Sequence, residues 1–110
     1  IVLENVLFEL NKAVLLPEAL AGLKNLETFM KRNPDLTISL EGHTDSTGEE
    51  NFNRKLSLDR AQAVADFLMA NGIDAERLLV QGFGSDNPLS SNEDETGRAR
   101  NRRVEMRIVE

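Results

Sequence analysis

The chain has no cysteine, only one histidine and only three prolines among its 110 residues. Without cysteine it forms no disulfide, holds no thiolate-ligated zinc or iron–sulfur cluster, and offers no thiol nucleophile. It also lacks a long apolar run, because Pro17, Glu18 and Lys24 interrupt its most apolar stretch, and a membrane-spanning helix needs roughly 20 apolar residues. We therefore expect no redox or thiol chemistry and no direct insertion of this domain into a membrane.

Positive charge is scarce as well. Thirteen Lys and Arg residues stand against 19 Asp and Glu residues, which gives a net charge of −6. Sequence-independent binding to nucleic acid depends on neutralising phosphates, so this balance argues against a nucleic-acid partner. The length and the 40% hydrophobic fraction predict one folded domain over residues 1–110. Since the chain opens on Ile1 without a signal-peptide pattern, we expect a mature segment or an excised domain.

Hydrophobic periodicity predicts four strands and two helices. The strand segments, in which apolar and polar residues alternate, are 6–10, 36–40, 78–83 and 104–109. The helical segments, with apolar residues three and four apart, are 17–33 and about 49–71. Pro34 and Gly72 are the stop signals of the two helices. The order β-α-β-α-β-β fits an α/β (α+β) two-layer sandwich, with a mixed four-stranded sheet and both helices on one face.

The second helical segment carries polar residues on its apolar side. The apolar stripe expected to face the core consists of Phe52, Leu56, Ala63, Val64, Phe67 and Leu68. Asn53 and Arg60 lie on the same side, about 10.5 Å apart along the axis. We expect both to line a groove where the first half of the helix leans away from the sheet. Two interpretations of Arg60 stay open: it extends along the apolar surface to solvent or to a carboxylate of the domain, or it binds a ligand carboxylate.

Asp45 lies in the polar loop between the second strand segment and this helix. In one interpretation it acts with Thr44, Ser46 and Thr47 to satisfy the backbone groups of a turn. In the other, Asp45 and Arg60 share one cleft, where the carboxylate accepts an ammonium group and the planar guanidinium binds a carboxylate. Such a cleft is complementary to the zwitterionic head group of an amino acid.

Other groups of polar residues give weaker signals. His43 offers a general base, but no order of Ser, Asp and His resembles a nucleophilic triad, so we expect no catalytic residue. The oxygen-bearing residues Asp86, Asn92, Glu93, Asp94 and Glu95 lack the alternating spacing of a calcium loop, which indicates a solvated loop and no metal or other cofactor. Four arginines fall within six residues near the C-terminus: Arg98, Arg100, Arg102 and Arg103. The neighbouring acidic residues offset the positive electrostatic potential of these arginines.

Three motifs together resemble one known family. Residues 42–48 read GHTDSTG, residues 53–61 fit N-x-x-L-S-x-x-R-A, and residues 101–104 read NRRV. With Gly72-Ile73, Gly82-Phe83-Gly84 and Pro88, they resemble the OmpA-like peptidoglycan-binding domain over nearly the whole chain. The resemblance implies a non-catalytic module on the periplasmic face of the Gram-negative outer membrane. It would bind the diaminopimelate residue of the peptidoglycan stem peptide and so anchor an outer-membrane protein or lipoprotein to the cell wall.

The resemblance also implies roles for individual residues. Asp45 and Arg60 would hold the amino and carboxylate groups of diaminopimelate, which agrees with the cleft inferred from the two side chains. Further residues would line or support the pocket: Leu10, Asn11, Thr44, Asn53, Leu56, Arg102 and Arg103. At Leu10 and Asn11 the family commonly has an aromatic residue followed by Asp, so this chain departs from the pattern there.

Two other functions remain open at this stage. The first is a protein-interaction module that docks an acidic partner through the arginines of residues 98–103. The second is a small-molecule enzyme on a similar fold, because a fold does not fix a function. Loss of wall binding after charge reversal at Arg102 and Arg103, but not after a change at Arg60, would indicate the first. Cleavage of wall fragments would indicate the second.

Overall fold

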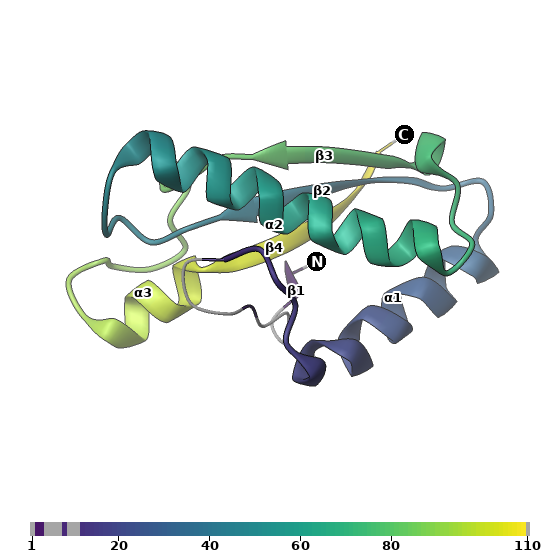
Figure 1. Cartoon of the computed structure of the whole chain (residues 1–110), viewed down its shortest axis with the longest axis horizontal. Coiled ribbons are helices and arrows are strands. Elements are labelled where there is room, and N and C mark those ends of the chain that lie inside the picture. Colours follow the sequence, from purple (N-terminus) through teal and green to yellow (C-terminus); the bar gives the residue numbers. More distant parts are fainter. Residues whose placement is uncertain (1, 4–7, 9–11, 110) are drawn as a thin grey trace.

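A computed structural model of the chain describes residues 2–3, 8 and 12–109 (Figure 1). A two-residue strand comes first and a short 3-10 helix follows: β1 (Val2–Leu3) and η1 (Pro17–Ala19). The next elements are α1 (Leu20–Arg32), β2 (Thr37–His43), α2 (Glu50–Ala70) and η2 (Ala75–Arg77). The last three are β3 (Leu78–Gly82), α3 (Glu95–Asn101) and β4 (Arg103–Val109). None of the helices in this described part combines the length and apolar character needed to cross a membrane.

The three long strands form a mixed sheet with β2 at its centre. β3 pairs with β2 in parallel and β4 pairs with β2 antiparallel, while Val2–Leu3 adds a short antiparallel pairing at the outer edge of β4. The strand expected at 6–10 lies outside the described residues apart from Phe8, which forms an isolated bridge with Leu15. The α+β class is as expected, whereas the four-stranded sheet that we expected is not confirmed.

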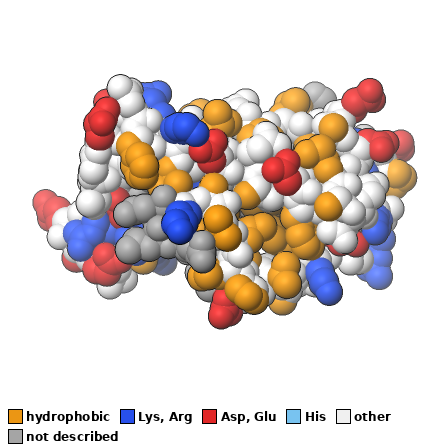
Figure 2. Space-filling view, viewed as in Figure 1, with side chains coloured by type: hydrophobic (Ala, Val, Ile, Leu, Met, Phe, Trp, Pro, Cys, Tyr) orange, Lys and Arg blue, Asp and Glu red, His pale blue; other side chains and the backbone are white. Residues whose placement is uncertain are grey.

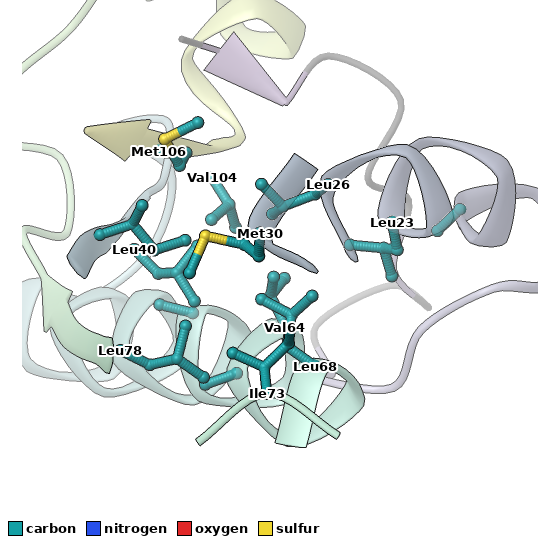
Figure 3. Close-up of a cluster of buried hydrophobic side chains, with 14 residues drawn as sticks. Leu23, Leu26, Met30, Leu40, Val64, Leu68, Ile73, Leu78, Val104 and Met106 are labelled. Atoms are coloured by element: carbon teal, nitrogen blue, oxygen red, sulfur yellow. The ribbon is translucent and has the colours of Figure 1, made fainter. Parts of the chain in front are cut away.

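The hydrophobic core lies between this sheet and the two longer helices. Leu23, Leu26 and Met30 of α1 meet Val64 and Leu68 of α2 over the same face of the sheet (Figure 3). The strands contribute Ile38, Leu40, Leu78, Val104 and Met106 to this cluster. Both helices therefore cover one face, because their apolar residues recur at helical spacing and the strand residues at alternate positions.

The helix ends follow the stop signals of the sequence. The α1 helix ends at Arg32, with Asn33 as its C-cap directly before Pro34. The α2 helix is followed by Gly72, whose φ of +98° is the left-handed conformation that glycine adopts at low cost. Both predicted ends are confirmed to within one or two residues.

The buried face of α2 differs from the predicted stripe. Phe52 is 47% exposed, whereas Asn53, Ser57 and Ala61 are buried. The cause is a close approach at Gly42 and Gly82, which pair with each other in β2 and β3. A Cβ on Gly42 would lie 1.9 Å from the backbone oxygen of Ser57. A Cβ on Gly82 would lie 2.5 Å from the backbone nitrogen of Leu58. The first half of α2 thus lies directly on the sheet, so the expectation that it leans away from the sheet is wrong.

Candidate ligand-binding site

A pocket of about 690 Å³ opens between the loop after β2, the first half of α2 and α3. These three segments gather at the left-hand end of the molecule in Figure 1. The lining residues are Thr44, Asp45, Thr47, Gly48, Phe52, Asn53, Leu56, Arg60, Glu95, Arg98 and Arg102. The structure thus brings together six of the nine residues expected at the site: Thr44, Asp45, Asn53, Leu56, Arg60 and Arg102. Leu10 and Asn11 lie outside the described residues.

Local hydrogen bonds fix the loop that carries Asp45. The backbone N–H of Thr47 donates to Asp45 Oδ1 at 2.8 Å, and Asn53 Nδ2 donates to the backbone oxygen of Thr47 at 2.9 Å. Gly48 turns the chain into α2 with a φ of +88°. Asn53 therefore reaches back from the first turn of the helix and holds the loop, which explains a buried amide on the inner face of α2.

Asp45 combines the turn role with a charged contact. Its side chain is only 11% exposed, and its Oδ2 accepts a hydrogen bond from Arg102 Nη1 at 2.7 Å. Burial alone would raise the pKa of the Asp45 carboxyl, but the hydrogen bonds from Arg102 and Thr47 outweigh it and lower the pKa below its ordinary value. Asp45 is thus an ionised carboxylate at the floor of the pocket, already paired with a cation of the domain.

Arg60 is half-buried and lines the same pocket. Its Nε donates to the backbone oxygen of Lys12 at 3.1 Å, and its guanidinium carbon lies 5.0 Å from the centre of the Phe8 ring. This stacking on an aromatic face holds the plane of the guanidinium. Burial lowers the pKa of Arg60, and the neighbouring charge of Arg102 lowers it further. Among the described residues no carboxylate forms an ion pair with Arg60.

The third wall is α3, which the sequence analysis missed by assigning this stretch to a solvated loop. Asp94 caps the helix by accepting a hydrogen bond from the N–H of Gly97 at 2.7 Å. The helix brings Glu95 and Arg98 to the pocket. An aspartate cap, an acidic first turn and a basic last turn were the available signals. They were overlooked because a helix of seven residues has no apolar periodicity.

The polar residues of the NRRV motif lie in different surroundings and have different partners. Asn101 is fully buried, and its Oδ1 accepts hydrogen bonds from the N–H groups of Leu89 and Ser90. Arg103 is buried on the sheet face opposite the helices, where it bonds Glu105 and the backbone oxygen of Asn87. Of these two arginines only Arg102 lines the pocket, and Arg103 is not among the lining residues. Adjacent residues at the start of a strand point to opposite faces.

His43 is not among the residues that line the pocket. It is buried against the ring of Phe83, with its Nε2 3.1 Å from Glu105 Oε2. Burial and the charge of Arg103 lower its pKa, although Glu105 and Glu41 act in the other direction. The described residues also contain no group of three or more acidic or histidine side chains arranged to hold a metal ion.

Comparisons with known proteins agree with this geometry. The OmpA family model matches residues 7–102. Peptidoglycan-binding protein ArfA of Mycobacterium tuberculosis is 42% identical over 94 residues, covering 86% of this chain and 29% of its own length. Outer membrane porin F of Pseudomonas aeruginosa is 40% identical over 105 residues, with coverage of 94% and 30%. The chain therefore spans about a third of the length of these relatives.

A solved structure extends the likeness to the fold. The peptidoglycan-associated lipoprotein from Burkholderia pseudomallei superposes with a TM-score of 0.87 at 26% identity. The match covers 94% of this chain and 88% of that one. The arrangement of the elements is thus shared with that solved chain.

Proposed function

This chain belongs to the OmpA family, and on that premise we propose that it binds peptidoglycan non-covalently and anchors the protein of which it is part to the cell wall. The names of ArfA and of the Burkholderia lipoprotein support wall binding, and the name of porin F supports an outer-membrane setting. We place the domain on the periplasmic face of the outer membrane. No step in this function requires a catalytic residue.

The proposed ligand is the diaminopimelate residue of the stem peptide. The observation that carries this proposal is one pocket lined by a buried carboxylate, Asp45, and a half-buried guanidinium, Arg60, without an ion-pair partner among the described residues. Of the hydrogen bonds in the described part of the chain, Arg60 donates only one, from Nε. Both terminal nitrogens thus remain to bind a carboxylate in a bidentate manner. Asp45 accepts the ligand's ammonium group.

Selectivity follows from the burial of these two groups. A ligand that lacks its carboxylate leaves Arg60 desolvated and without a carboxylate, and one that lacks its ammonium leaves Asp45 with only its contacts inside the domain. Each loss costs about 1–3 kcal/mol. The contact with a single stem peptide is small, yet many copies facing one polymeric wall bind with avidity, because each further attachment is effectively intramolecular.

The test is a set of double-mutant cycles across the interface, measured by titration calorimetry. Amidating the side-chain carboxylate of diaminopimelate should weaken binding to the wild type and matter little in Arg60→Ala. Acetylating its amine should likewise matter little in Asp45→Asn. Direct partners should show coupling of about 1.5 kcal/mol or more. Arg32→Ala, at an exposed arginine of α1, is the control.

Two results would contradict the proposal. If amidation costs the same in the wild type and in Arg60→Ala, then Arg60 has a structural role only. If the domain releases cleavage products from isolated sacculi, it is an enzyme and not a binding module.

A further inference from the structure

The α3 side of the pocket carries charged groups that the diaminopimelate contacts do not use. Among the described residues, five charged side chains line the pocket, namely three arginines and two carboxylates: Arg60, Arg98, Arg102, Asp45 and Glu95. The described part of the lining therefore has one excess positive charge, in a chain whose net charge is −6. Figure 2 shows basic and acidic side chains intermixed over α3.

A zwitterionic head group does not balance this charge. It brings one ammonium for Asp45 and one carboxylate for Arg60, so its net charge is zero and the excess cation stays. The volume of about 690 Å³ is also in the range of pockets that take ligands much larger than one head group. Both observations favour a ligand with a further negative charge on the α3 side.

Glu95 occupies the position where that charge would bind. Its Oε1 accepts a hydrogen bond from Arg102 Nη2, and its Oε2 lies 3.4 Å from Arg98 Nε. The Glu95 side chain is 64% exposed, whereas that of Arg98 is 29% exposed. An exposed carboxylate on a flexible side chain gains little from such pairs. Glu95 is thus readily displaced, while the arginines are the more fixed partners.

Arg98 is held in place independently of Glu95. Its Nη1 donates to the backbone oxygen of Asn92 at 3.0 Å. The Asn92 side chain in turn accepts a hydrogen bond from the buried Asn101 at 2.8 Å. Arg102 is fixed from the other side by Asp45. When Glu95 leaves, both guanidinium groups stay near the pocket, which is the preorganisation that an anion site needs.

We propose that Arg98 and Arg102 form a second carboxylate subsite, which Glu95 occupies in the free domain and which a second carboxylate of the same ligand takes over on binding. This inference rests on the proposed function. In the stem peptide, the acidic residue that precedes diaminopimelate is joined through its side chain and so keeps a free α-carboxylate. That carboxylate is the expected occupant, and Arg98 is then a specificity-determining residue for the unamidated peptide.

The test uses two tripeptides of alanine, γ-linked D-glutamate and diaminopimelate, which differ only in whether the α-carboxylate of the glutamate is free or amidated. By titration calorimetry, the wild type should bind the free-acid tripeptide about tenfold more tightly than the amidated one. Arg98→Gln should bind both with the same reduced affinity. The matched control is Arg100→Gln, at an exposed arginine of α3 outside the pocket lining, which should keep the tenfold preference.

A second variant tests the displacement of Glu95. Because Glu95→Gln removes the competing carboxylate, it should bind the free-acid tripeptide several-fold more tightly than the wild type does, with a smaller change for the amidated tripeptide. Weaker binding of the free acid by Glu95→Gln would overturn the displacement. Thermal unfolding of each variant shows whether it is folded.

The outcomes separate this inference from the proposed function. If the wild type binds both tripeptides equally and Arg60→Ala abolishes binding, the proposed function stands and the subsite is refuted. If Arg98→Gln weakens the binding of both tripeptides but keeps the tenfold preference for the free acid, Arg98 has a structural role and the subsite is refuted. If neither tripeptide binds the wild type, both proposals fail.

Discussion

The close approach of α2 to the sheet makes Gly42→Ala the most informative test of the fold. The added Cβ would lie 1.9 Å from the backbone oxygen of Ser57 and 2.7 Å from its carbonyl carbon. Ordinary contacts begin at about 3.4 Å, so helix and strand must separate by about 1.5 Å. The oxygen and the carbonyl carbon of Ser57 cannot rotate away, because both belong to the backbone of α2.

The expected loss follows from this geometry. Overpacking in a tight core costs about 1–3 kcal/mol, and with two rigid backbones we expect the upper end, about 3 kcal/mol. For a domain of this size that lowers Tm by more than about 10 °C. Separation of α2 would also displace Asn53 and Arg60, so affinity for the wall should fall together with stability.

The matched control is Gly22→Ala, in the first turn of α1, where a Cβ would meet nothing within 4 Å. Alanine is favoured over glycine in a helix by about 0.8–1 kcal/mol, so this variant should be at least as stable as the wild type. Urea unfolding and thermal scans of both variants provide the measurement. If Gly42→Ala unfolds within about 0.5 kcal/mol of the wild type, the close approach does not limit the packing of α2.

Three further predictions concern the pocket. Arg60→Lys should co-sediment with Gram-negative sacculi nearly as poorly as Arg60→Ala, because lysine keeps the charge but loses the planar fork; full binding by the lysine variant would show that charge alone suffices. The lowered pKa of Asp45 contributes stability above its unfolded pKa of about 3.9 that is lost as the pH falls through the folded value. The stability difference between the wild type and Asp45→Asn should therefore be largest at neutral pH and shrink below about pH 4, and urea titrations in which it grows with acidity would contradict this. Binding and Tm should not change with EDTA; a fall in Tm that calcium restores would instead indicate a metal site in the acidic stretch of residues 86–95.

The sequence predicted the elements whose apolar residues are periodic. The α1 and α2 helices and the three long strands fall within a few residues of the expected segments. The predicted core face of α2 was correct at Val64 and Leu68 but wrong in the first half of the helix. There hydrophobicity alone favoured Phe52 over the small residues Ser57 and Ala61. A close approach depends on which strand residues face the helix, here Gly42 and Gly82, and that information is in the sheet register and not in the helix.

The site was predictable in part. Helix phase and the loop sequence allowed an interpretation in which Asp45 and Arg60 share one cleft, and both residues line the pocket. They did not reveal that Asp45 pairs with Arg102, which lies 57 residues further along the chain. They also did not separate Arg102 from Arg103, since only the pairing of β4 decides which arginine faces the pocket. Contacts set by topology are not visible in local patterns.

The pairing of β4 with β2 also determines when during folding the domain becomes able to bind. Gly42 pairs with Val104 and His43 with Arg103, and this register brings Arg102 to Asp45. Contacts between segments so distant in sequence form slowly, because a long loop must first close. A slip of one residue would turn every side chain of β4 to the other face. A chain that has already assembled α1, α2 and the parallel strands therefore still lacks the contact between Arg102 and Asp45 in its pocket. Under the proposed function, only copies that have folded completely should attach to the wall.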